Sequence, residues 1–213
     1  QERLREHKTV SLNMADRGLA VTVYNRTASV TDAFVAQLPA GSNIVASHDL
    51  AGLAASLAHP RTVFLMATAG KVVDLVIAGL LPHLEAGDII IDGGNSFFKD
   101  SQRRRQELAE HDIRFLGMGI SGGEEGARHG PSIMPGGDPS AWPQVKDIFQ
   151  RIAAKADDGE PCCRWVGEGG AGHYVKMIHN GIEYGDMQLI AEAWQLMRDG
   201  LGMPAQEIAE TFT

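Results

Sequence analysis

Short apolar runs alternate with segments of helical period along the first four fifths of the chain. The runs expected as strands are Ala20–Tyr24, Asn43–Ala46, Arg61–Ala67, Asp88–Asp92, Arg114–Ile120, Ser132–Gly137 and Cys162–Gly167. The segments expected as helices are one that ends at a cap on Gly18, then Asp32–Leu38, Leu50–Leu57, Val72–Leu84, Lys99–Glu110 and Ser140–Ala154. Repeated strand–helix–strand units predict an α/β fold with a mainly parallel, doubly wound sheet.

Loops with chemical character follow several of these expected strands. They are Asn25-Arg26-Thr27, Thr68-Ala69-Gly70, Gly93-Gly94-Asn95-Ser96 and Ser121-Gly122-Gly123. Ligands of open α/β sheets bind beyond the carboxyl ends of the strands, where these loops lie. The serine hydroxyl and open backbone of Ser121–Gly123 suit a carboxylate or a phosphate, although a plain glycine turn has the same composition. Arg26 suits the 2′-phosphate of NADP, but for a lone arginine without further context an ordinary surface residue is the better explanation.

The run Gly172–Glu192 has the most specific pattern in the chain. Lys176, His179, Asn180 and Glu183 share one helical face at positions i, i+3, i+4 and i+7. Lys176 and Glu183 are then about 10 Å apart along the axis, too far to neutralise each other and well spaced to hold a small polar molecule. Gly181 and Gly185 interrupt the helix and indicate close approach by a ligand or another backbone. A solvated face with glycines for packing explains the pattern equally well.

Composition narrows the class of protein. The chain has 213 residues, 44% of them hydrophobic, and a formal net charge of −8. That charge argues against nucleic acid and anionic membranes as partners, while a small anionic ligand remains possible. No apolar run approaches the ~20 residues that span a membrane, and no signal peptide is recognisable. The adjacent Cys162 and Cys163 could form a disulfide only with strain, so we expect a reducing, cytoplasmic location. They match no metal-ligand spacing, so we expect no metal.

These segments together closely resemble the family of decarboxylating 6-phosphogluconate dehydrogenases. The residues that carry the resemblance are Asn25–Thr27, Ile89–Ser96, Ser121–Ala127, Gly130–Gly137, Ile152–Lys155, Gly159–Cys162 and Gly169–Ala193. The resemblance covers about residues 12 to 213 and favours the functional interpretation of the polar helix face. It implies a Rossmann-like NADP-binding domain over residues 1–169, and the start of an all-helical domain, truncated here, over residues 170–213.

The resemblance also implies roles for individual residues. Lys176 corresponds to the general base that takes the proton of the substrate 3-hydroxyl, for which it has to lose its own proton. Glu183 corresponds to the acid that protonates C1 after CO₂ has left. The residues that correspond to substrate contacts are Asn95, Ser121, Gly122, Gly123, His179, Asn180 and Tyr184. Those that correspond to cofactor contacts are Asn25, Arg26, Thr27, Ala67, Thr68, Ala69 and Asn95.

Three departures from the family pattern stand out. Residues 1 to 7 read Gln-Glu-Arg-Leu-Arg-Glu-His, where the family has a strand and a Gly-x-Ala-x-x-Gly turn. Ala67-Thr68-Ala69-Gly70 replaces the usual Val-Lys-Ala-Gly, with loss of one positive charge. The chain also stops where the family continues into the helical domain that supplies the dimer interface. We therefore expect a fragment of an enzyme that is a homodimer at full length, with little or no turnover of 6-phosphogluconate by itself.

Two other functions compete with this one. A β-hydroxyacid dehydrogenase of the same wider superfamily has a similar Ser-Gly-Gly loop and helix lysine, but usually follows the lysine with Asn-Asn. Glu183 and Tyr184 argue against it. The other alternative is a catalytically dead remnant that only binds, which the first eleven residues and the abrupt end favour.

Overall fold

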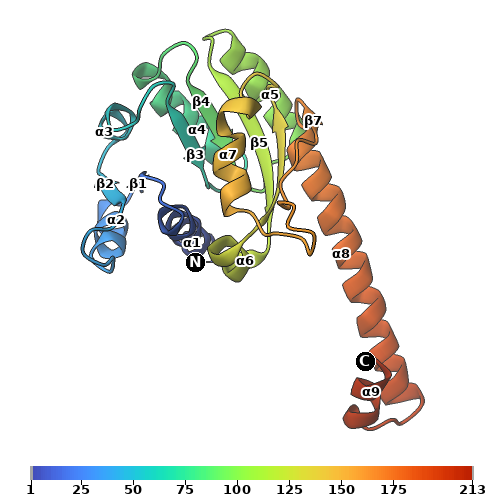
Figure 1. Cartoon of the computed structure of the whole chain (residues 1–213). Coiled ribbons are helices and arrows are strands. Elements are labelled where there is room, and N and C mark those ends of the chain that lie inside the picture. Colours follow the sequence, from blue (N-terminus) through green and yellow to red (C-terminus); the bar gives the residue numbers. More distant parts are fainter. Residues whose placement is uncertain (1, 213) are drawn as a thin grey trace. The chain divides into compact units, whose positions relative to one another are not determined.

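A computed structural model shows how these elements are arranged (Figure 1). The structure describes the backbone of residues 2–212 and the side chains of residues 8–212. The chain divides into two compact units, residues 1–176 and residues 177–213. Each unit is described separately below.

The larger unit is built on a five-stranded sheet with the order β3-β4-β5-β6-β7. Its strands are β3 (Thr62–Leu65), β4 (Ile89–Asp92), β5 (Arg114–Ser121), β6 (Ser132–Gly137) and β7 (Gly167–Glu168). β3, β4 and β5 are parallel, β5 and β6 are antiparallel, and β6 and β7 are parallel. A second, two-stranded parallel sheet contains β1 (Val21–Tyr24) and β2 (Ile44–Ser47). The Rossmann-like, mainly parallel fold class is confirmed.

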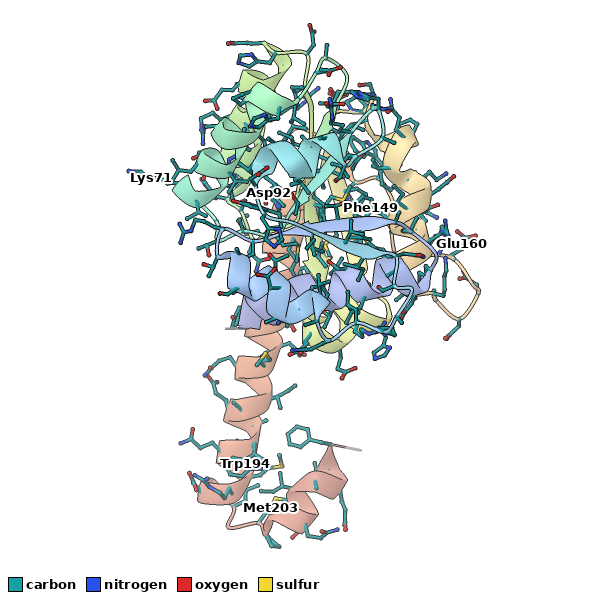
Figure 2. The ribbon with its side chains drawn as sticks, turned by 90° about the vertical axis from the view of Figure 1, so that its left-hand side faces the viewer. Lys71, Asp92, Phe149, Glu160, Trp194 and Met203 are labelled. Atoms are coloured by element: carbon teal, nitrogen blue, oxygen red, sulfur yellow. The ribbon has the colours of Figure 1, made fainter. Side chains whose placement is uncertain are left out.

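Helices cover both faces of the five-stranded sheet because its central strands are apolar on both sides. The helices of this unit are α1 (Glu2–Asp16), α2 (Ala28–Val35), α3 (Leu50–Ala55), α4 (Lys71–Leu80), the 3₁₀ turn η1 (Leu81–His83), α5 (Phe98–Ala109), α6 (Gly123–His129) and α7 (Trp142–Ile152). Ile89 and Ile91 of β4 point to a core formed with α1, α6 and α7, whereas Ile90 points to a core formed with α3, α4 and α5. Phe149 of α7, labelled in Figure 2, packs edge-on against Phe64 in the first of these cores.

The last strand differs from the prediction. We expected it over Cys162–Gly167, but β7 comprises only Gly167 and Glu168, and Cys163 forms just an isolated bridge to Ile133. The neighbouring strand β6 contains Pro135, which has no N–H to donate, and this limits the ladder to Gly136 and Gly137. Apolar alternation alone could not reveal that the partner strand has this gap.

The N-terminal segment is a helix, α1, where the family pattern has a strand and a glycine turn. The side chains of residues 2–7 lie outside the described part of the chain. Further along α1, Asn13 is fully buried, and its Nδ2 donates hydrogen bonds to the carbonyls of Ala127 and Ile152. These bonds fix the second half of α1 against α6 and α7. The helix ends as predicted, with the N–H of Gly18 bonded to the carbonyl of Ala15.

The smaller unit consists of helices. The long helix α8 (Ala171–Gln195) begins in the larger unit and continues into the smaller one, followed by the π-helical turn η2 (Leu196–Gly200) and by α9 (Ala205–Thr211). Met203 precedes α9 and is labelled in Figure 2. The helix α9 begins directly after Pro204, as predicted. Over residues 2–212, none of these helices combines the length and apolar character that a membrane crossing requires.

Candidate functional site

The carboxyl ends of three parallel strands bring most of the predicted loops to one edge of the five-stranded sheet. β3 leads to Ala67, Thr68 and Ala69, β4 leads to Asn95, and β5 ends at Ser121. Thr68 and Asn95 are exposed, and Ser121 is half-buried. Gly122 and Gly123 are exposed at the start of α6. A ligand at this edge can therefore reach all three loops.

Lys176 lies on the first turns of α8 and is buried in the larger unit. Its Cβ is so close to Gly119 of β5 that a Cβ added to this glycine would lie 2.4 Å from it. The same added atom would lie 3.0 Å from the carbonyl oxygen of Gly172. The absence of a side chain at Gly119, two residues before Ser121, therefore lets α8 hold Lys176 next to the carboxyl end of β5.

The other predicted residues of α8 belong to the smaller unit. His179, Glu183 and Tyr184 are exposed, and Asn180 is half-buried. The Nδ1 atom of His179 lies 3.8 Å from Oε2 of Glu183, one helical turn further on. All four residues share one continuous helix with Lys176, as predicted.

Gly181 and Gly185 have no close neighbour among the described residues beyond the backbone of their own helix turns. A Cβ added at Gly181 or at Gly185 would meet no described atom within 4 Å. Packing within the described residues therefore does not account for them. The interpretation that a ligand or another backbone approaches here stays a prediction.

A buried ionic network, which the sequence pattern did not reveal, lies beneath two of the loops. Arg104 of α5 is 1% exposed, and its guanidinium donates to Asp74 (2.7 Å), Asp92 (3.3 Å), Ser96 Oγ (3.3 Å) and the carbonyl of Gly70 (3.0 Å). The sequence offers one signal for a buried arginine, which is the run Arg103–Arg105 in the predicted helix. Three consecutive helical residues point in different directions, so one of them tends to face the core.

Asp92 fixes the shape of the β4–α5 loop. Its carboxylate is fully buried and accepts hydrogen bonds from the N–H of Gly94 (3.0 Å) and from the hydroxyl of Ser96 (2.6 Å). A side chain at Gly94 would collide with the carbonyl oxygen of Ala67, since an added Cβ would lie 2.8 Å from it. The β3–α4 and β4–α5 loops are therefore in direct backbone contact. Figure 2 labels Asp92, and also Lys71 at the start of α4.

His173 connects α8 to the same region. Its ring is 2% exposed, and Nδ1 lies 2.6 Å from the hydroxyl of Ser101 on α5. Burial lowers the pKa of His173, and the Arg104 guanidinium acts in the same direction, while Asp92 and the backbone of Gly94 oppose the shift. The ring is therefore neutral at pH 7. The missing side chain of Gly117 makes room for it.

The residues expected to select the cofactor lie at the end of the two-stranded sheet. Asn25, Arg26 and Thr27 follow β1, with Arg26 and Thr27 exposed. The side-chain oxygen of Asn25 accepts a hydrogen bond from the N–H of Thr27 (2.9 Å), which shapes this turn. An exposed arginine in this position suits a phosphate.

The N-terminal helix differs from the resembled pattern at the pyrophosphate. The helical backbone from Glu2 onward does not reproduce the glycine turn that binds a pyrophosphate in this family's pattern.

In the described range, His, Cys, Asp and Glu side chains nowhere gather in a group of three that could hold a metal ion. Cys163 is buried, and burial raises the pKa of its thiol to about 12, so it is an unreactive thiol at neutral pH.

Comparison with known proteins agrees with this geometry. The model for the NAD binding domain of 6-phosphogluconate dehydrogenase matches residues 8–167, and the model for the C-terminal domain of the same enzyme matches residues 172–213. Curated proteins named "6-phosphogluconate dehydrogenase, decarboxylating" from Haemophilus ducreyi and Schizosaccharomyces pombe are 61% and 59% identical over 201 residues. The matches cover 94% of this chain but only 42% and 41% of those relatives, so the chain spans less than half of their length.

Solved structures give the same result. The 6-phosphogluconate dehydrogenase of Plasmodium falciparum, described in apo form and in complexes with NADP+ and with 6-phosphogluconate, matches with a TM-score of 0.90 and 41% identity. That match covers 96% of this chain and 44% of the other. A 3-hydroxyisobutyrate dehydrogenase of Mycobacterium tuberculosis matches with a TM-score of 0.80 at 21% identity, which shows a shared fold alone.

The family model covers most of the larger unit, and the curated relatives share more than half of the matched residues. The chain belongs to the 6-phosphogluconate dehydrogenase family.

Proposed function

We propose that this chain carries the NADP-binding part and the catalytic helix of a decarboxylating 6-phosphogluconate dehydrogenase. Such an enzyme converts 6-phosphogluconate to ribulose 5-phosphate and CO₂ and forms NADPH. The observation that carries the proposal is the burial of Lys176 beside Gly119, near the carboxyl end of the strand that leads into Ser121–Gly123. A lysine there is next to loops suited to a carboxylate and to a dinucleotide.

The proposed chemistry divides the work between two residues of α8. Lys176 accepts the proton of the C3 hydroxyl as C3 is oxidised, and bound NADP supplies the hydride acceptor. The resulting 3-keto acid loses CO₂ because the ketone accepts the electron pair of the breaking C–C bond. Glu183 then donates a proton to C1 of the enediolate that this step leaves. Ser121, Gly122 and Gly123 hold the carboxylate end of the substrate, with Asn95, His179, Asn180 and Tyr184 beside it.

Arg26 is the proposed determinant of cofactor choice. Its guanidinium would pair with the 2′-phosphate of NADP, with Asn25 and Thr27 beside it, and Ala67, Thr68 and Ala69 would line the rest of the cofactor site. The proposal further includes a homodimer at full length, which the resemblance supports, and a cytoplasmic location, which the free thiols of Cys162 and Cys163 support.

Cofactor titration tests the proposal. We expect a chimera, in which this chain replaces the matched stretch of the Haemophilus ducreyi relative, to bind NADP more tightly than NAD. Arg26→Glu should reverse or abolish that preference, because a carboxylate repels the 2′-phosphate and accepts a hydrogen bond from a free 2′-hydroxyl. Calorimetric titration of both cofactors against both proteins gives the four affinities. Equal affinity of the parent chimera for NAD and NADP would refute the assignment of Arg26.

A further inference from the structure

The Arg104 guanidinium hydrogen-bonds directly to both loops that follow β3 and β4. It donates to the carbonyl of Gly70 at the end of the β3–α4 loop, and to Ser96 in the β4–α5 loop. It also binds the carboxylates of Asp74 in α4 and of Asp92 at the end of β4. These are the loops that carry Ala67–Ala69 and Asn95.

The network has the features of a preorganised support. Arg104 and Asp92 are 1% and 0% exposed, so neither side chain can exchange its partners for water. Burial by itself would raise the pKa of Asp74, but hydrogen bonds from Arg104 and Arg103 outweigh that effect and lower it, so Asp74 keeps its charge. The planar, five-donor guanidinium is what lets one side chain serve four acceptors, which an ammonium group cannot do in this geometry.

We propose that Arg104 is a positioning residue, which fixes the β3–α4 and β4–α5 loops relative to each other in the conformation that receives the dinucleotide. This inference rests on the proposed NADP site. Arg104 itself lies beneath the loops and acts through their backbone. Without it, Asp92 would still shape its own loop through Gly94 and Ser96. The hydrogen bond to Gly70 would be lost, and Asp74 would keep only its bond to Arg103.

The chain contains a matched control at the opposite end of the same two strands. Arg61 immediately precedes β3, and Asp88 immediately precedes β4. Their side chains are 11% and 1% exposed and are joined by a 3.0 Å ion pair, and Arg61 also donates to the carbonyl of Ala54. Loss of Arg61 therefore removes a comparable buried ion pair from the same part of the sheet, far along the strands from the two loops.

The experiment compares Arg104→Met, Arg104→Lys and Arg61→Met in the 213-residue chain. Thermal unfolding gives the stability of each variant, calorimetric titration gives its affinity for NADP, and hydrogen–deuterium exchange reports on residues 66–70 and 93–97. All three variants should lose stability. Both Arg104 variants should bind NADP about tenfold more weakly while folded, because the competent loop conformation becomes a minor state. Their two loops should exchange faster, whereas Arg61→Met should keep the parent affinity and the parent exchange in both loops.

Each other outcome has a definite meaning. The inference is overturned if the Arg104 variants bind NADP as the parent does, or if Arg61→Met weakens binding equally. It is also overturned if both Arg104 variants fail to fold while Arg61→Met folds, since Arg104 is then a residue of general stability. If the parent chain itself does not bind NADP, the cofactor part of the proposed function fails for this chain, and exchange alone decides. Faster exchange confined to the two loops in the Arg104 variants would support positioning, and unchanged exchange would refute it.

Discussion

At the scale of single residues, burial determines the protonation state of His173. His173 is nine-tenths or more buried against Ser101 and close to Asp92 and Arg104, and burial lowers its pKa. The ring therefore enters the folded structure in its neutral form. Protonation of His173 costs more free energy in the folded state than in the unfolded state, so this residue links the stability of the fold to pH.

The first prediction follows from that linkage. Below about pH 6.5, the unfolded chain protonates His173 while the folded chain does not, so the unfolded state binds more protons. The free energy of unfolding should therefore fall as the pH falls through this range, by at most about 1.4 kcal/mol per pH unit for one group. Urea unfolding between pH 5 and pH 8 measures the slope. His173→Asn should flatten it, and the same substitution at the exposed His111 serves as the control. An unchanged slope in His173→Asn would contradict the prediction.

The second prediction separates the two residues proposed to act on the substrate. In the chimera with the Haemophilus ducreyi relative, Lys176→Met should abolish hydride transfer, because no base remains for the 3-hydroxyl. Glu183→Gln keeps the shape but cannot readily donate a proton, so turnover should fall by about 10²–10⁴-fold, with the loss after hydride transfer. Single-turnover NADPH formation, measured beside thermal unfolding, distinguishes the two steps. If folded Lys176→Met retains most of its hydride-transfer rate, the base has been assigned wrongly.

At the scale of elements, glycines set how closely α8 approaches the sheet. Gly117 makes room for the ring of His173, and Gly119 makes room for the Cβ of Lys176. Gly117 and Gly119 are two residues apart and lie on one face of β5. His173 and Lys176 are three residues apart and lie on one face of α8, so these two faces can pack against each other. Substitution of either glycine would move the helix that carries the proposed base.

The third prediction tests this contact. Gly119→Ala should destabilise the fold by roughly 1–3 kcal/mol, because the added methyl group meets both a side chain and a backbone carbonyl. The control is Gly181→Ala in α8, where an added Cβ would meet no described atom within 4 Å. This substitution should be neutral or stabilising. Urea unfolding of the two variants gives the comparison. A Gly119→Ala variant as stable as the parent would show that α8 can shift without cost.

Much of this arrangement could be predicted from the sequence, for identifiable reasons. Short apolar runs located β3, β4 and β5, and their parallel order placed Asn95 and Ser121 at one edge. The helical period around Lys176 placed this residue on one helix with Asn180 and Glu183, as α8 does. What could not be predicted depends on contacts between distant segments. Arg104 looks like any other arginine of a polar helix until the fold places it over Asp92, and the gap at Pro135 shortens β7 only because β6 is its neighbour.

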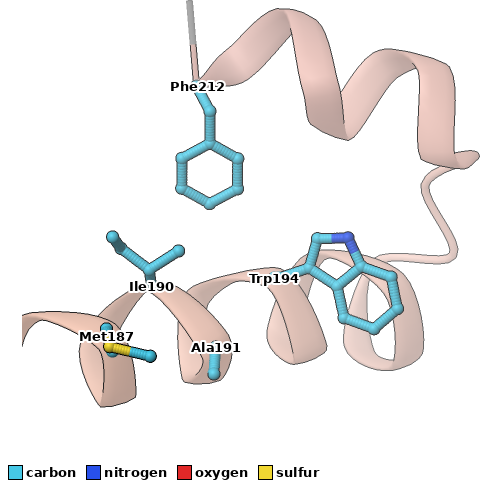
Figure 3. Close-up of a pocket in the computed structure, with 5 residues that line it drawn as sticks. All are labelled: Met187, Ile190, Ala191, Trp194 and Phe212. Atoms are coloured by element: carbon cyan, nitrogen blue, oxygen red, sulfur yellow. The ribbon is translucent and has the colours of Figure 1, made fainter. Parts of the chain in front are cut away.

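At the scale of the whole molecule, the smaller unit has little core of its own. Ile208 is its main fully buried apolar side chain within the described residues, while Ile182 and Leu189 are 69% and 67% exposed. Met187, Ile190, Ala191, Trp194 and Phe212 line an apolar hollow of about 500 Å³, across which Phe212 faces Ile190 and Trp194 (Figure 3). Large exposed apolar patches on a folded protein are typical of surfaces that bind another protein or associate.

The last prediction is that the purified 213-residue chain self-associates through this unit. Apolar side chains are exposed at Ile178, Ile182, Leu189 and Trp194. Their burial in an interface lowers the free energy by about 25 cal/mol per Å² removed from water. Sedimentation velocity should therefore show a mean mass that rises with concentration. Ile182→Ser combined with Leu189→Ser should shift the distribution toward monomer. Leu75→Ser, which removes an equally exposed leucine from α4 in the larger unit, should leave it unchanged. If the parent chain stays monomeric at high concentration, or if the Leu75 variant dissociates it as well, then the exposed face of α8 is not what drives association.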